Sequence, residues 1–194
     1  MKKAGSFVLM LAAVALVVLC GCGVSYAAAP FHIGVMTGTV SQQEDELRGA
    51  EKLMEIYGDE AHGGMVKHVT YPDNFMQEME TTISQIVGLA DDPKMKVIIA
   101  STAVPGTTEA FRRVKEKRPD ILCLAGNSQE DPGVISSIAD LTVNPNDIYR
   151  GYLLPMAAKK MGAKNFVHIS FPRHMSYELL SRRRNIMEAT CKDI

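Results

Sequence analysis

Small polar side chains follow three short, largely apolar stretches of the sequence, at the point where each one ends. His32–Met36, Lys96–Ala100 and Asp120–Ala125 are typical of buried parallel strands. The carboxyl ends of parallel strands meet at one edge of a sheet, where open α/β folds bind their ligands. We therefore expect a polar cluster at that edge, formed by Thr37, Thr39, Ser41, Gln42, Ser101, Thr102, Asn127 and Ser128.

These residues offer hydroxyl and amide groups, which both donate and accept hydrogen bonds. With helix N-termini beside them, such groups suit sugars, nucleosides or small anions. A plainer interpretation stays open for each residue, because Ser and Thr after a strand often cap the next helix or satisfy the turn backbone.

Helix- and strand-type segments alternate after the first strand. Ser41–Tyr57 is predicted as a helix, with Ser41 as N-cap and Glu44 completing a capping box. The later segments are a strand at Val66–Tyr71, helices after Asn74 and Gly106, a further apolar segment at Val134–Val143, a helix at Ile148–Met161 capped by Asp147, a buried-type strand at Asn165–Phe171, and a last helix with Arg182–Arg184 across its outer side. This alternation predicts an α/β fold, an open and mostly parallel sheet with helices on both faces.

The first residues have the pattern of a signal peptide. Lys2 and Lys3 precede the uncharged apolar run Phe7–Leu19, and small residues follow. The run is shorter than the roughly 20 residues that a membrane-spanning helix needs. We expect an exported protein.

Two ways of processing the signal remain open. Leu19–Cys22 resembles a bacterial lipobox, although Cys20 stands where a small residue is usual. Processing there would make Cys22 the lipidated first residue, with 1–22 as signal, 23–30 as tether, and the protein anchored to the cell membrane on its outer or periplasmic side. The alternative is ordinary cleavage after Ala27, which would release a soluble exported protein.

Composition and motifs narrow the function. The formal net charge is −1, so a basic face for nucleic acid is not expected. The sequence holds no Gly-x-Ser-x-Gly, His-Glu-x-x-His, Walker or Gly-x-Gly-x-x-Gly motif. We therefore predict no enzyme activity, no cofactor and no metal.

The histidines and cysteines fit structural roles. His32 and His168 lie in predicted strands, where core positions are expected, whereas His62 and His68 could approach each other as a weak metal candidate. Cys123 lies in an apolar run, as a small buried hydrophobe would.

Several stretches together carry a resemblance to a known fold. They are Ile33–Gly38, Val97–Thr102, Ile121–Asn127, Asp147–Tyr152 and Met161–Ile169. Their order is similar to the type I periplasmic-binding-protein superfamily, and in particular resembles an uncharacterised family of bacterial exported lipoproteins within it.

The resemblance implies two α/β lobes that close on a ligand. Residues 31–143 would form the first lobe, and residues 144–194 the crossover and the start of the second. Arg173 and His174 would face the ligand from the second lobe, where Arg173 suits a carboxylate or phosphate. Because the sequence stops after one βα unit of that lobe, we expect a fragment or a truncated product with a poorly packed terminal segment.

The resemblance favours an exported solute-binding protein that takes up a small polar molecule, with an ABC-type permease as its partner. The alternative is a ligand sensor that reports to a membrane partner without transport.

Overall fold

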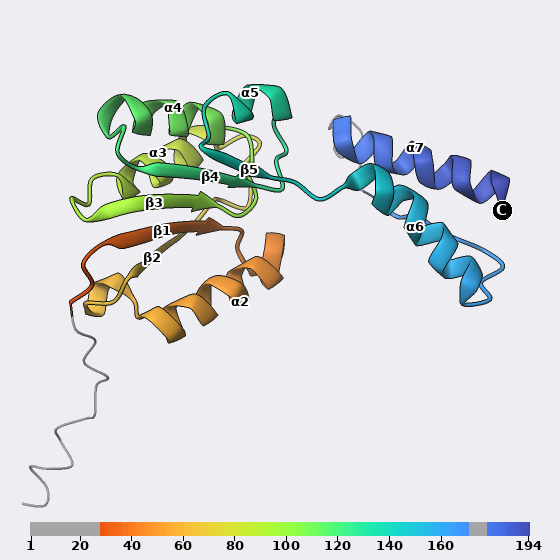
Figure 1. The fold of residues 1–194 in the computed structure, drawn as a ribbon, viewed down its shortest axis with the longest axis horizontal. Helices are drawn as coiled ribbons and strands as arrows, with labels where there is room; N and C mark the ends of the chain where they lie inside the picture. Colours follow the sequence, from red (N-terminus) through yellow and green to blue (C-terminus); the bar gives the residue numbers. More distant parts are fainter. Residues whose placement is uncertain (1–27, 171–177) are drawn as a thin grey trace, which may run out of the picture.

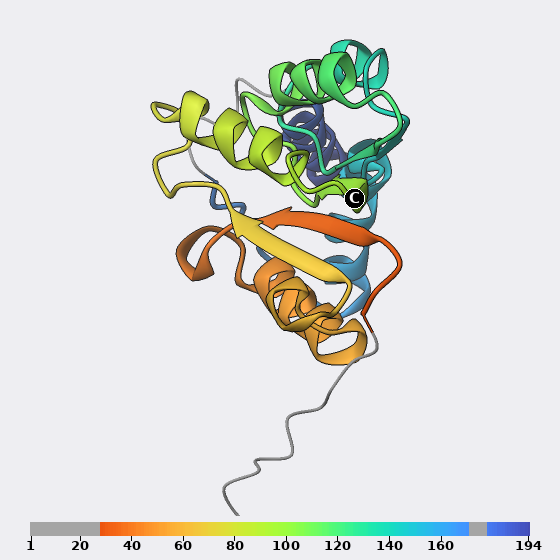
Figure 2. The ribbon, with the colours of Figure 1, turned by 90° about the vertical axis from the view of Figure 1, so that its left-hand side faces the viewer.

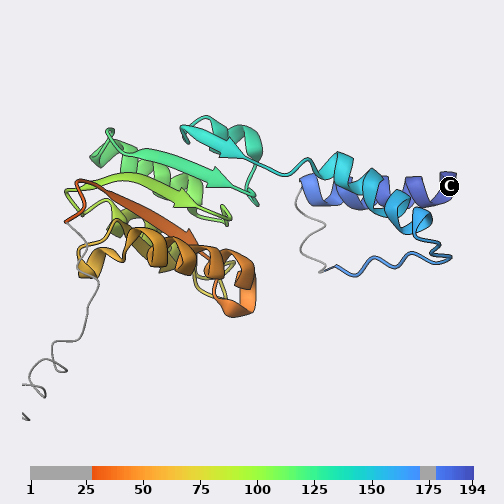
Figure 3. The same cartoon turned by 60° about the horizontal axis from the view of Figure 1, so that its bottom comes forward.

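The predicted α/β class is confirmed by the computed structural model, which describes residues 28–170 and 178–194. A parallel sheet of five strands has the order β2-β1-β3-β4-β5, and its arrowheads point to one edge (Figure 3). The strands are β1 (His32–Thr37), β2 (Val66–Thr70), β3 (Met95–Ala100), β4 (Leu122–Gly126) and β5 (Leu141–Val143).

Helices cover both faces of the sheet. Helix α2 (Val40–Tyr57) lies on one face, and α3 (Met79–Leu89), α4 (Thr107–Lys117) and the short α5 (Pro132–Ser136) lie on the other (Figures 1 and 2). A single 3₁₀ turn, η1 (Glu60–His62), precedes β2. Helices α3 and α4 pack their apolar stripes on the sheet, as expected for strands joined by helical crossovers.

The main core lies between the sheet and helices α3 and α4. Met36, Ile98 and Phe111 are fully buried there. A smaller cluster of Val35, Ala50 and Val66 lies under α2. Val35 pairs with Ile99, Ile99 with Leu124, and Leu124 with Leu141 in successive strands. Leu124 and Leu141 therefore lie on the same face of the sheet as Val35.

The α2 face of the sheet is covered unevenly. Helix α2 contacts β1 and β2. Further along the same face, the side chains of Leu122 and Leu141 are each 51% exposed. The apolar side of α2 is likewise only partly covered, since Ala50 is buried while Leu53 and Tyr57 are exposed.

Two helices lie beyond the carboxyl edge and pack against each other. They are α6 (Asp147–Lys160) and α7 (Glu178–Asp193), joined to β5 by residues 144–146 (Figure 1). Asn146 caps α6 by accepting a hydrogen bond from the Tyr149 N–H, so the prediction of Asp147 as the cap was wrong. The carboxylate of Asp147 instead accepts a 2.8 Å hydrogen bond from Arg183.

That pair corrects the prediction that Arg182–Arg184 all lie on an outer face. The Arg183 side chain is 17% exposed and faces Asp147, which is 3% exposed. A buried carboxylate needs a paired cation, and the nearest helical neighbour supplies it.

Residues 165–170 form no strand, contrary to prediction. They run as exposed irregular chain, with Ile169 89% exposed and His168 outside any core. A strand needs a partner for its backbone N–H and C=O groups, and none of the described strands lies beside this segment. The apolar segment Val134–Val143 is likewise divided, between the end of α5 and strand β5.

The remaining predictions concern cysteines and export. Cys123 is buried as expected, and burial raises the pKa of its thiol to about 11. The proposed lipidation site Cys22 lies outside the described residues. Among residues 28–170 and 178–194, no helix is long and apolar enough to cross a membrane.

Candidate functional site

The sheet has a topological switch point between β1 and β3. The chain runs from β1 outward to β2 on one side, and from β3 through β4 to β5 on the other. Open α/β sheets bind ligands in the crevice outside the carboxyl ends of their strands at such a point. Met36 at the end of β1 pairs with Ala100 at the end of β3, which places Ser101 and Thr102 at the crevice.

A carboxylate from α2 joins these hydroxyl groups. Ser101 Oγ donates to Glu46 Oε2 at 2.7 Å, and Thr102 Oγ1 donates to Glu46 Oε1 at 2.5 Å. Asn127 Nδ2 donates to Thr102 Oγ1 at 3.3 Å. We call these four residues the Glu46 network, and they link α2 with the ends of β3 and β4.

Glycines let the backbones meet closely here. A Cβ atom on Gly126 would lie 2.4 Å from the Ser101 carbonyl oxygen. A Cβ on Gly38 would lie 2.7 Å from the Tyr71 hydroxyl and 2.9 Å from Gln43 Cβ. Both contacts are too short for any larger residue, so the turns after β1 and β4 depend on glycine.

A second group surrounds Asp73, which follows β2. Its carboxylate accepts a hydrogen bond from Thr39 Oγ1, and the Thr39 and Ser41 hydroxyls lie 3.0 Å apart. Gln42 Nε2 donates to the Asp73 carbonyl oxygen at 3.0 Å. We call these four residues the Asp73 cluster. Hydrogen bonds from Thr39 and Ser41 hold the pKa of Asp73 below its ordinary value.

The predicted capping box is absent, because α2 begins at Val40 and Ser41 lies inside its first turn. Thr39, not Ser41, occupies the N-cap position of α2, and its side chain does not cap the helix. The Thr39 hydroxyl instead donates a charge-assisted hydrogen bond to the Asp73 carboxylate. Gln43 is also non-helical, with φ −150° and ψ 72°, so the first turn of α2 is set off from the rest.

Thr37 is buried and takes part in local packing. Its hydroxyl donates to the Gly38 carbonyl oxygen at 2.9 Å and contacts His68 Nε2 at 2.8 Å. Burial lowers the pKa of His68, which favours the neutral imidazole.

Asn127 and Ser128 form the turn after β4. Asn127 has a positive φ of 39°, which Asn tolerates better than most residues. The Ser128 N–H donates to Asn144 Oδ1 at 2.7 Å, and its hydroxyl donates to the Glu130 carbonyl oxygen at 3.1 Å. The Ser128 side chain therefore serves the turn.

The structure thus gathers seven of the predicted site residues into the Glu46 network, the Asp73 cluster and the Thr37 contact, with Ser128 beside them. Arg173 and His174 lie outside the described residues. Sequence reasoning missed Glu46, Asp73 and His68. The acidic run Glu44–Glu46 just after the first turn was the available signal for the first of these.

One group of side chains could approach a metal ion. Atoms of His32, Glu60 and Asp92 lie within 4.8 Å of one another. However, His32 Nδ1 and Asp92 Oδ2 are only 2.6 Å apart, shorter than the roughly 3.4 Å between two ligands of one tetrahedral zinc ion. The contact is a hydrogen bond that satisfies a buried histidine, as predicted for His32.

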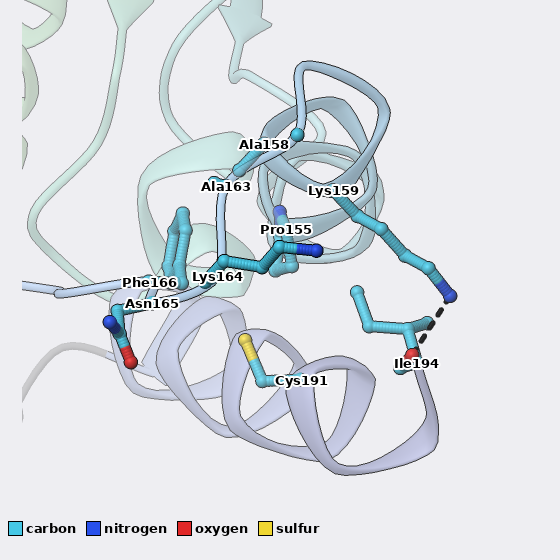
Figure 4. A pocket seen from close by; sticks show the side chains of 10 residues that line it. Pro155, Ala158, Lys159, Ala163, Lys164, Asn165, Phe166, Cys191 and Ile194 are labelled. Atoms are coloured by element: carbon cyan, nitrogen blue, oxygen red, sulfur yellow. Dashed lines mark hydrogen bonds between the residues drawn. The ribbon is translucent and has the colours of Figure 1, made fainter.

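A hollow of about 430 Å³ lies between α6, α7 and the segment after α6 (Figure 4). Lys164, Phe166 and Cys191 line it, and Lys159 Nζ donates to the Ile194 oxygen at 2.8 Å. None of the described site residues predicted from sequence is among its lining residues. It is separate from the carboxyl edge, and we assign no ligand to it.

Similar structures and relatives were found for the chain. A crystal structure from Clostridium difficile 630, provisionally named as a transcriptional regulator, superposes with a TM-score of 0.68 and is 28% identical. The match covers 86% of this chain and 48% of that one, so the chain spans about half the length of that structure. A substrate-binding protein of an ABC transporter from Desulfitobacterium hafniense, in complex with Leu, has a TM-score of 0.43 at 15% identity over 84% of this chain and 47% of that one, too low to carry an argument.

The sequence relatives decide the family. An "Uncharacterized protein" of Treponema pallidum (strain Nichols) is 42% identical over 174 residues, which is 89% of this chain and 79% of the relative. Residues 31–194 match a family model described as "Protein of unknown function (DUF3798)". The chain belongs to the DUF3798 family.

Proposed function

We propose that the chain binds a small polar solute at the switch point of its sheet. The observation that carries the proposal is the Glu46 network, in which polar groups from α2 and from the turns after β3 and β4 converge where an open α/β sheet binds its ligands. The network is formed by side chains far apart in sequence, such as Glu46 and Thr102.

The wider proposal is an exported solute-binding protein. Residues 31–143 would form one lobe, residues 144–194 would begin a second, and the ligand would lie between them. Anchoring through Cys22 and delivery to an ABC-type permease complete this proposal. Its support is the signal-like N-terminus and the resemblance of the sequence to type I periplasmic binding proteins. We propose no chemical step, because the sequence offers no catalytic motif.

A thermal-shift screen of the purified chain tests solute binding. The panel contains sugars, nucleosides, amino acids, amines and small anions. A ligand at 100 times its dissociation constant adds about 2.7 kcal/mol of stability, which raises the melting temperature measurably. We expect at least one compound to stabilise the chain, and the shift to be lost in Thr102→Val.

The matched control is Thr108→Val, because Thr108 has a similarly hydrogen-bonded hydroxyl but lies on α4 and contacts Glu130 instead. If no compound shifts the melting temperature, or if every shift survives in Thr102→Val, the proposed site is wrong.

A second candidate function is ligand sensing without transport. It is favoured by the provisional name of the Clostridium difficile structure as a transcriptional regulator. Both functions need the same ligand site, and they differ in the partner. Crosslinking in intact cells separates them, since a permease subunit would be captured in one case and a signalling protein in the other.

A further inference from the structure

We propose that the solute is a small organic cation that presents N–H donors to Glu46. This inference rests on the proposed function, because it names the ligand class for the same site. It narrows the range of sugars, nucleosides and small anions that the sequence allowed.

The hydroxyl protons of Ser101 and Thr102 in the Glu46 network are already engaged in hydrogen bonds. The single proton of Thr102 Oγ1 lies toward Glu46, and that of Ser101 Oγ is shared between Glu46 and the Met36 carbonyl oxygen at 2.9 Å. The remaining hydrogen-bonding capacity of this carboxylate is therefore its lone pairs. A ligand that binds Glu46 must supply donors.

Glu46 also lacks a cationic partner among the described residues. It is half-buried and its contacts there are hydroxyl groups. A partly buried carboxylate is more stable beside a positive charge than beside neutral hydroxyl groups alone. An ammonium or amidinium group of the ligand would meet that need with charge-assisted hydrogen bonds.

The neighbouring Asp73 cluster also contains a carboxylate that is hydrogen-bonded by hydroxyl groups. The Asp73 carboxylate takes its hydrogen bond from Thr39, and hydroxyl groups, not cations, lower its pKa. Nearby His68 is held toward its neutral form by burial. Both polar groups at this end of the sheet thus carry negative charge and present acceptors.

The N-terminus of helix α4 is already occupied by a carboxylate. Glu130 accepts hydrogen bonds from the Gly106 N–H at 2.9 Å and the Thr108 N–H at 2.8 Å, at the start of α4. This carboxylate satisfies the positive end of the helix. An anionic solute at the switch point would meet the carboxylates of Glu46 and Asp73, which disfavours it.

Isothermal titration calorimetry of the purified chain tests the inference. The probes are putrescine and agmatine as cations, ribose and adenosine as neutral ligands, and inorganic phosphate as an anion. We expect a cationic probe to bind, and Glu46→Gln to weaken it by about 10- to 100-fold, since hydrogen bonds to a charged group are lost. Added salt should also weaken binding to the parent chain.

Glu44→Gln is the matched control, because Glu44 is an exposed carboxylate on the same helix that pairs with Arg48. It should leave the affinity within about twofold. Melting temperatures of both variants show whether each is folded, and the salt dependence of the parent supplies a test that needs no variant.

The outcomes distinguish a failure of the cation inference from a failure of the proposed solute-binding function. Binding of ribose, adenosine or phosphate that is lost in Thr102→Val but kept in Glu46→Gln overturns the cation inference and leaves the site standing. Binding of a cation that ignores Glu46→Gln also overturns it. If no probe binds the parent chain at millimolar concentration, and the thermal-shift screen finds no ligand either, the proposed function itself is wrong.

Discussion

Protonation of His68, at the carboxyl edge of the sheet, is expected to make the free energy of unfolding depend on pH. Its imidazole contacts Thr37 at 2.8 Å, and burial lowers its pKa in the folded chain below the unfolded value of about 6.5. Above that pH the imidazole is neutral in both the folded and the unfolded chain, and the contribution of His68 to the free energy of unfolding is fully present. As the pH falls through about 6.5, the unfolded chain takes up the proton first, so stability decreases until the lower folded-state pKa is passed.

The prediction is that the free energy of unfolding falls between pH 7.5 and pH 5, and that His68→Gln reduces this slope. Urea unfolding at a series of pH values measures it. His62→Gln is the control, because the His62 side chain is 80% exposed. A slope that His68→Gln leaves unchanged would show that other groups cause the pH dependence.

The polar residues at the strand ends were predictable, but their partners were not. Ser101, Thr102 and Asn127 were identified because each follows an apolar run. Glu46 and Asp73 looked like ordinary surface carboxylates, since only the fold brings Glu46 to the residues after β3 and places the turn after β2 beside Thr39. The burial of Thr37 beside His68 decides between a packing role and a ligand role for this residue. That burial could not be predicted from the sequence.

A buried ion pair links the two helices beyond the sheet. Asp147 and Arg183 lie 2.8 Å apart and are largely shielded from water. Removing one partner of a buried pair leaves an uncompensated charge, which costs about 3 kcal/mol. We predict that Asp147→Asn lowers the hydrogen-exchange protection of the α7 amides by roughly 100-fold, with little effect on the sheet.

The control for this prediction is Glu188→Gln, which breaks an exposed pair with Lys192. Such surface pairs contribute less than about 1 kcal/mol. Equal loss of protection in the two variants would mean that Asp147 has no special part in joining α6 to α7.

The strands that are paired in the sheet and covered by helices could be predicted from the sequence. The segment that lacks such neighbours could not. Strands β1, β3 and β4 are β-branched or apolar runs between helices, and the structure has them within one or two residues of the prediction. The segment 165–170 has a similar composition but lies beside no described strand, so its pattern was misleading. The capping box failed because α2 begins at Val40, which places Ser41 inside the first turn and not at the N-cap.

At the scale of the whole molecule, one sheet supplies one side of a proposed cleft. The sheet ends at Val143, and α6 begins at Asp147 just outside the carboxyl edge (Figure 1). The Clostridium difficile structure has about twice the length of this match. The alternation of strands and helices predicted the sheet, whereas the placement of the last two helices depends on long-range packing that no local pattern encodes.

We propose that solute binds at the switch point between β1 and β3. The most direct measurement is a ¹H–¹⁵N NMR titration of the labelled chain with the amine, sugar and nucleoside probes. We expect the amide shifts to be concentrated at residues 37–46, 101–102 and 127–128. Shifts confined to α6 and α7, or no shifts with any probe, would contradict it.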